Sequence, residues 1–163
     1  MPGAGFAEAT ADGTVDSWRS LLARYLAVRD GVCAVYQLVD ARRGGVAGRV
    51  DRELLALVAR SAAVRERGAR HALVLTKVDR VSAEALDATV ARVRADAAAA
   101  LDDALAEAGD SARRAGDARP QIDVLATSAR ARPPRGRDVL WRHLHVSVDA
   151  RWRGRNAAIP DRE

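Results

Sequence analysis

The chain has 163 residues, of which 27 are basic and 22 acidic, giving a formal net charge of +5. This length favours a single domain with a moderate core, and because aromatic residues make up only 4% of the sequence, Leu, Val and Ala must form most of that core. No apolar stretch reaches the roughly 18 residues that a membrane-spanning helix requires, so we expect no membrane partner.

Apolar residues recur in a pattern that predicts helices and strands in strict alternation. A first helix, capped by Asp16, precedes a nearly continuous apolar strand over residues 32–39, as expected for a strand that is covered on both faces. The later predicted elements are a helix over 50–67, a strand over 72–75, a helix from Ser82 to Gly109, a strand over 122–126 and a helix over 136–146. Residues 110–120 predict a polar loop, and residues 151–163 a flexible tail.

This alternation predicts a three-layer α/β fold in which right-handed helical crossovers join parallel strands. Ligands of such sheets bind at the carboxyl ends of the strands. Asp40, residues 76–79 and residues 127–129 all fall at predicted strand ends. The positions of these strand ends therefore predict a ligand site built from these three segments.

Lys77 is the only lysine among the 27 basic residues, and it lies directly after a predicted strand in Thr76-Lys77-Val78-Asp79. A strand followed by [Asn/Thr]-Lys-x-Asp is the pattern with which GTPases recognise guanine. In that pattern the lysine stem lies across the purine plane, and the aspartate accepts hydrogen bonds from the N1–H and the exocyclic amine, which adenine does not present.

Further blocks occur in the same order as in one group of GTPases. The chain resembles the C-terminal part of the EngB/YihA/YsxC-type GTPases, a ribosome-assembly branch of the P-loop GTPases. The matching residues are Pro2-Gly3, Gly5-Phe6-Ala7, Trp18 with Tyr25-Leu26 and Arg29, Leu38-Val39-Asp40 with Arg42, Thr76 to Asp79, and Ser128-Ala129 with Gly136.

The resemblance implies a partial Ras-like G domain over residues 1–150 that binds GTP or GDP. It assigns guanine recognition to Thr76, Lys77, Asp79, Ser128 and Ala129, and it matches Gly3 to the glycine whose amide meets the terminal phosphate. It assigns no catalytic residue and no metal ligand in this chain. The Mg²⁺ of complete family members would have its ligands upstream.

No Gly-x-x-x-x-Gly-Lys-[Ser/Thr] sequence, the family's phosphate loop, occurs in the chain. By the resemblance the chain begins inside the family's third motif, so we expect a G domain without its N-terminal half and without GTP hydrolysis. The implied partner is a ribosomal subunit or rRNA. The implied location is the bacterial cytoplasm, or a mitochondrion or plastid in a eukaryote.

Two further expectations follow. The strand over 32–39 would normally pair with an upstream strand, so we expect it to form an unprotected sheet edge through which the chain self-associates. The alternative function is a non-catalytic basic α/β domain that binds RNA or a protein partner through arginine-rich surfaces. That function requires arginines gathered on one face, whereas Arg42-Arg43, Arg113-Arg114 and the arginines of 130–137 are dispersed along the chain.

Overall fold

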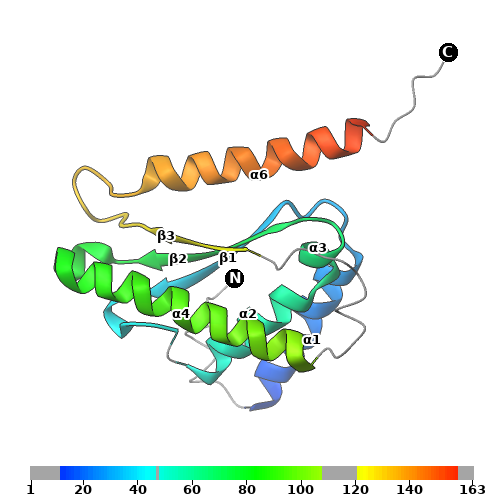
Figure 1. The fold of residues 1–163 in the computed structure, drawn as a ribbon, viewed down its shortest axis with the longest axis horizontal. Coiled ribbons are helices and arrows are strands. Elements are labelled where there is room, and N and C mark those ends of the chain that lie inside the picture. Colours follow the sequence, from blue (N-terminus) through cyan, green and yellow to red (C-terminus); the bar gives the residue numbers. More distant parts are fainter. Residues whose placement is uncertain (1–11, 47, 108–120, 158–163) are drawn as a thin grey trace.

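The computed structural model describes residues 12–46, 48–107 and 121–157. They form three parallel strands with helices on both faces (Figure 1). The strands are β1 (Ala34–Asp40), β2 (Arg70–Thr76) and β3 (Ile122–Ala126). The helices are α1 (Asp12–Val28), α2 (Arg49–Arg60), α3 (Ala62–Arg65), α4 (Ala83–Glu107) and α6 (Arg137–Ala157), with short 3-10 turns at Ala41–Arg43 and Val78–Arg80. The predicted α/β class with parallel strands is confirmed.

The strands lie in the order β1-β2-β3, so β2 is central. Asp40 at the end of β1 is in register with Thr76 at the end of β2, and Leu75 is in register with Ala126 at the end of β3. The three strands therefore finish side by side at one edge of the sheet, where the loops that follow them meet. In the described part of the chain, β1 pairs with β2 alone, as expected for a sheet edge.

Alternate residues of the strands face two different helical layers. Val39, Leu73 and Leu75 pack with residues of α2 and α4, including Leu55 and Val93, in the largest buried cluster. The opposite face of the sheet carries a smaller cluster that Leu140 of α6 joins. Of the described helices, Figure 1 shows α6 over that face and α1, α2 and α4 beneath the other. Most of the core thus lies under α2 and α4.

Several predicted helix boundaries were wrong. The helix predicted over 50–67 is interrupted at Ser61, whose extended backbone separates α2 from α3. The Ser61 hydroxyl donates to the Val58 carbonyl oxygen at 2.7 Å, an example of a serine side chain competing with the helical backbone for a hydrogen bond. Asp16 lies inside α1 rather than at its cap, and bonds Arg19 one turn on. The prediction that Ser82 caps α4 is confirmed, because its hydroxyl accepts from the Ala85 amide at 3.2 Å.

The last helix is longer than predicted. It was expected to end at Val146, with a flexible tail from residue 151, but α6 continues to Ala157. Arg151 explains part of the extension, because its guanidinium donates to the carbonyl oxygen of Arg67 at 2.8 Å and to that of Asp30. These long-range bonds fix the added turns of α6 against the body of the domain. The predicted polar loop over 110–120 lies outside the described residues.

Candidate functional site

The loops after the three strands are held together by extensions of the sheet. Thr127 continues the pairing of β3, since its amide donates to the Leu75 carbonyl oxygen at 2.7 Å and its hydroxyl reaches the same oxygen at 3.2 Å. Thr76 makes the equivalent bond to β1, since its hydroxyl donates to the Val39 carbonyl oxygen at 3.2 Å. The two threonines therefore fix the start of each loop relative to its neighbouring strand.

Lys77 adopts a left-handed backbone conformation, with φ 59° and ψ 32°, and is the only non-glycine residue with positive φ in the described ranges. This region is sparsely populated by side-chain-bearing residues and carries a conformational cost of about 1–3 kcal/mol. The turn directs the chain from β2 into the 3-10 turn that carries Asp79. The side chain of Lys77 is 54% exposed, and its Nζ lies 2.8 Å from Oδ2 of Asp40.

Asp40 links Lys77 to Arg42. The Arg42 guanidinium donates through Nε to both carboxylate oxygens, at 3.0 and 3.2 Å, and through Nη2 to Oδ2 at 2.6 Å. The Arg42 amide also donates to Oδ1 at 3.1 Å. Hydrogen bonds from Arg42, with a further one from Lys77, hold the pKa of the Asp40 carboxyl well below its usual range. Asp40 is therefore ionised at neutral pH and positions two cations beside each other.

Asp79 is oriented by the loop after β3. The Ser128 hydroxyl donates to Oδ1 of Asp79 and in turn accepts from the Ala131 amide at 3.2 Å. Arg80 Nε lies 3.5 Å from the other carboxylate oxygen. The bond from Ser128 is the main cause that lowers the pKa of Asp79. An ionised carboxylate has about four acceptor positions, so Ser128 can orient Asp79 and leave acceptor capacity for a ligand.

Gly136 allows this loop to close. Ser128 and Arg135 form an antiparallel bridge. The Ser128 amide nitrogen lies 3.0 Å from the Arg135 carbonyl oxygen, and the Arg135 amide nitrogen lies 3.1 Å from the Ser128 carbonyl oxygen. The next residue, Gly136, has φ +68°, and a Cβ there would lie 1.9 Å from the Ala126 carbonyl oxygen. Only glycine fits this close approach, which explains a residue that the sequence pattern had matched without a physical reason.

These segments surround a cavity of about 640 Å³ at the carboxyl edge of the sheet. All five residues predicted to recognise guanine line it. The complete lining is Arg42, Thr76, Lys77, Asp79, Arg80, Thr127, Ser128, Ala129 and Arg130. Sequence analysis missed Arg80 and Arg130 as site residues, although each directly follows a predicted one, and it recorded Arg42 only as a family match.

Gly3, which the resemblance matches to a phosphate-binding glycine, lies outside the described residues. Where the structure is described, no group of three His, Cys, Asp or Glu side chains is close enough to hold a metal ion.

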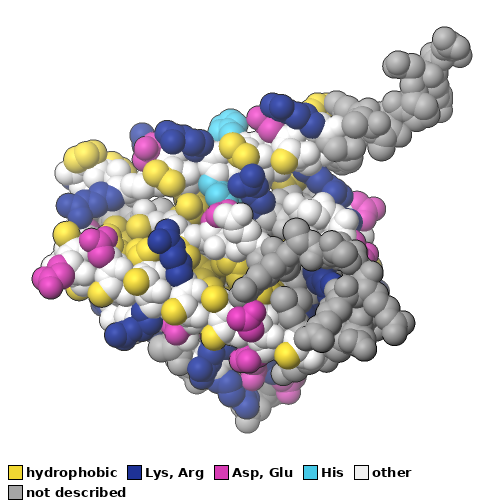
Figure 2. Space-filling view, in the orientation of Figure 1, with side chains coloured by type: hydrophobic (Ala, Val, Ile, Leu, Met, Phe, Trp, Pro, Cys, Tyr) yellow, Lys and Arg dark blue, Asp and Glu magenta, His cyan; other side chains and the backbone are white. Residues whose placement is uncertain are grey.

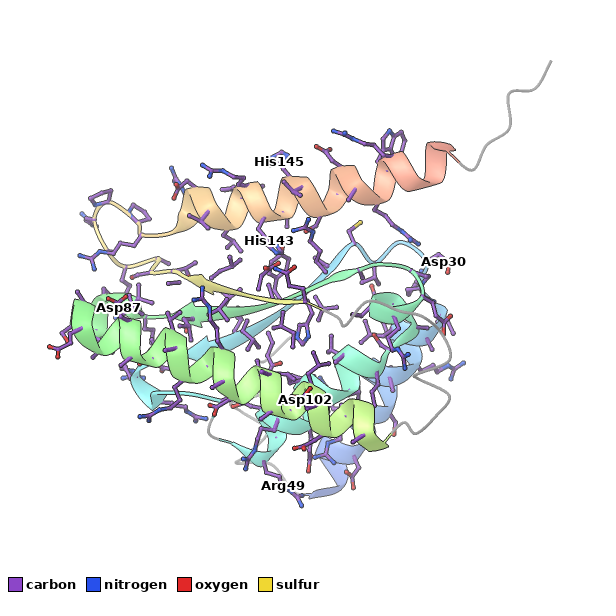
Figure 3. All side chains as sticks on the ribbon, in the orientation of Figure 1. Asp30, Arg49, Asp87, Asp102, His143 and His145 are labelled. Carbon is purple, nitrogen blue, oxygen red and sulfur yellow. The ribbon has the colours of Figure 1, made fainter. Side chains whose placement is uncertain are left out.

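A second polar cluster lies on the α6 face of the sheet. His143 of α6 lies between the Tyr36 hydroxyl, 2.9 Å from Nδ1, and Asp123 Oδ2, 3.0 Å from Nε2. With Nε2–H donating to the carboxylate, Nδ1 is free to accept from the tyrosine. Figure 3 shows His143 directed from α6 toward the sheet and His145 directed away. This cluster fixes α6 to β1 and β3 and lies apart from the residues that line the cavity.

No family model matches this sequence. Curated proteins do match it, and each of the following is a probable GTP-binding protein EngB. The protein of Ruegeria pomeroyi is 38% identical over 95 residues, which are 58% of this chain and 40% of the relative. That of Afipia carboxidovorans is 38% identical over 91 residues, 56% of this chain and 37% of the relative. That of Sinorhizobium medicae is 39% identical over 83 residues, 51% of this chain and 34% of the relative. The matched region thus spans about two fifths or less of each relative.

A parallel α/β sheet with helices on both faces, and a cavity lined by charged and polar side chains at its carboxyl edge, occurs in P-loop GTPase G domains, and the similarity to EngB proteins points to that class. Within this class, the matched part of the chain is similar to a region of the EngB-type GTP-binding proteins.

Proposed function

We propose that this chain binds GTP or GDP by recognising the guanine base in the cavity at the carboxyl edge of the sheet. The observation that carries the proposal is the convergence of two segments 49 residues apart in sequence, joined by the Asp79–Ser128 hydrogen bond. Both segments line the same cavity of about 640 Å³. The relatives that match the chain are named as GTP-binding proteins, which supports the same reading.

Each residue has a role in this proposal. Asp79 accepts from the N1–H and the exocyclic amine of guanine, while the aliphatic stem of Lys77 covers one face of the purine. Backbone amides near Ser128 and Ala129 approach the guanine carbonyl oxygen. Thr76, which bonds the Val39 carbonyl oxygen, holds the start of the loop in place. Adenine lacks the two donors that Asp79 accepts, so it should bind less well.

The 163-residue chain should bind the nucleotide weakly and without hydrolysing it. In P-loop proteins most of the affinity comes from phosphates held by backbone amides at a helix N-terminus, and the corresponding Gly-Lys-[Ser/Thr] sequence does not occur in this chain. We therefore expect a dissociation constant in roughly the millimolar range for guanosine.

The test is a change of base preference on Asp79→Asn. An asparagine amide can donate to the oxygen that xanthine carries in place of the guanine amine, so the variant should prefer xanthosine to guanosine. NMR titrations of the wild type and the variant with guanosine, xanthosine and adenosine measure this. Asp103→Asn, an exposed aspartate on α4, is the matched control and should keep the preference for guanosine. Equal binding of adenosine and guanosine by the wild type would refute the assignment.

We further propose ribosome assembly as the setting, with a ribosomal subunit or rRNA as the partner. Its support is the EngB-type similarity together with a formal net charge of +5, which suits phosphate contacts. Figure 2 shows Lys and Arg side chains along α6 and on the outer helices of this view. Co-sedimentation of the chain with purified ribosomal subunits, in low and high salt, tests the proposal. Absence of the chain from the subunit fractions at low salt would contradict it.

We also propose that two copies associate through the edge of β1. The exposed edge carries no charged residue from Ala34 to Val39, and Leu38 is 61% exposed. Beside it lies a mainly apolar groove of about 420 Å³ between α1, residues 31–36 and α6. An uncharged edge with apolar flanks favours strand pairing between copies.

Leu38→Lys tests this association, because a lysine on a sheet edge opposes pairing and the exposed position tolerates it. Size-exclusion chromatography with light scattering should show a dimer for the wild type and a monomer for the variant. Val139→Lys on α6, which is 45% exposed and does not line the groove, is the control and should remain dimeric. A wild-type monomer at high concentration would contradict the proposal.

A further inference from the structure

The charged residues of the cavity carry more positive than negative charge. Four cationic side chains line it, namely Arg42, Lys77, Arg80 and Arg130. Two carboxylates bond to three of them: Asp40 to Arg42 and Lys77, and Asp79 to Arg80. Two positive charges are left in excess. A neutral base or nucleoside would not balance this charge, whereas a phosphate monoester would.

The cationic side chains extend from the proposed base site toward the end of β1. Asp79 and Ser128 lie at the ends of β2 and β3, where the proposed base is recognised. The side chain of Lys77 extends from the end of β2 toward β1, since its Nζ contacts Asp40 at the end of β1. Nη2 of Arg42 contacts the same oxygen of Asp40, at 2.6 Å against 2.8 Å for the lysine Nζ. Arg42 is thus the next cation beyond the one whose stem would cover the base.

The guanidinium of Arg42 is oriented by the domain, but its positive charge is not fully neutralised there. Its hydrogen bonds to Asp40 use Nε and Nη2, which orient the planar guanidinium from one side, and its side chain is 55% exposed. Asp40 is shared with Lys77, so the three groups together keep one net positive charge. A guanidinium oriented in this way is suited to paired hydrogen bonds with phosphate oxygens.

We propose that Arg42, oriented by Asp40, binds the 5′-phosphate of the guanine nucleotide. This inference rests on the proposed base site and extends it, because it names a side chain of this chain that would hold the phosphate. Arg80 and Arg130 line the part of the cavity nearest Asp79 and Ser128 and add to the attraction for an anion. Lysine at position 42 would keep the charge but not the paired geometry.

The experiment compares guanosine, GMP and AMP with NMR titrations of the full chain. Wild type should bind GMP about tenfold more tightly than guanosine, the factor expected for about one charge-assisted hydrogen bond. Arg42→Gln should lose this gain, and the dispersion of its amide NMR signals should show that the variant is folded. Arg94→Gln, an exposed arginine on α4 that does not line the cavity, should keep the gain.

The outcomes separate this inference from the base assignment. A GMP gain that persists in Arg42→Gln, or no gain in the wild type, overturns the role of Arg42 and leaves guanine recognition intact. Equal binding of AMP and GMP, with the gain lost in Arg42→Gln, overturns guanine recognition and supports the phosphate contact. No binding of guanosine or GMP by the wild type overturns both.

Discussion

His71 should make the stability of this domain depend on pH between about 6.5 and 4. It lies on β2, on the same face as Leu73 and Leu75, which pack against α2 and α4. Its side chain is 1% exposed. Neither ring nitrogen has a hydrogen-bond partner in the described part of the chain. Burial without a partner lowers the pKa of His71 to about 4, because the charged imidazolium would lose its hydration.

The sign and size of the effect follow from proton binding. Below pH 6.5 the unfolded chain takes up a proton at His71 that the native chain does not, so falling pH favours unfolding. The stability is fully present above pH 6.5, decreases toward pH 4 and changes no further below it. Each pH unit is worth about 1.4 kcal/mol, so the total loss is about 3 kcal/mol. Loss on this scale is a large part of the 5–15 kcal/mol typical of a domain.

Urea unfolding at several pH values between 7.5 and 4.5 measures this loss. His71→Leu should remove most of the pH dependence in that window, while His145→Leu, on the exposed side of α6, should leave it unchanged. The lowered pKa values of Asp40 and Asp79 act in the same direction only at more acidic pH, as these carboxylates become protonated. Equal pH dependence in the wild type and His71→Leu would refute the reasoning.

Three more outcomes are expected. Ser128→Ala should raise the pKa of the Asp79 carboxyl toward its ordinary value, since it removes the hydrogen bond that lowers it, and NMR titration of the side-chain carbon reports this directly. Gly136→Ala should destabilise the domain by several kcal/mol in urea unfolding, because the new Cβ would lie 1.9 Å from the Ala126 carbonyl oxygen and the backbone must move; a loss below about 1 kcal/mol would show that the loop is more adaptable than its geometry indicates. The purified chain should release no phosphate from GTP above the buffer blank, since positioned cationic groups normally supply most of phosphoryl-transfer catalysis, and turnover dependent on magnesium would contradict this.

Much of the sheet could be predicted because its strands are short apolar runs bounded by polar, charged or glycine residues. β3 matches its predicted range, and β2 extends its predicted range by residues at both ends. The helices were harder to bound. The interruption at Ser61 depends on one hydroxyl bond, and the added length of α6 depends on contacts of Arg151 with residues more than 80 positions away. Neither appears in a local pattern of apolar residues.

The segments that form the candidate site could be predicted because the positions of the strand ends could be predicted. Parallel strands bring their carboxyl ends to one edge, so Thr76 to Asp79 and Ser128-Ala129 could be expected to meet, and they line one cavity. Side-chain pairings between them could not be derived in the same way. The Asp40 carboxylate was placed at the edge by its strand, but its sharing between Arg42 and Lys77 depends on rotamers and on the left-handed turn at Lys77.

The Tyr36–His143–Asp123 cluster shows how α6 contributes to the site without touching the cavity. The loop that carries Ser128 is bounded by β3 on one side and by α6 on the other, and Gly136 joins the loop to that helix. Because His143 bonds β1 through Tyr36 and β3 through Asp123, the helix cannot shift along the sheet without breaking a partly buried hydrogen bond. Much of the outer surface of α6 is apolar and exposed, including Trp141 and Trp152, so apolar burial alone would attach it weakly. Polar contacts from His143 and Arg151 therefore fix the helix, and through it the far end of the loop that orients Asp79.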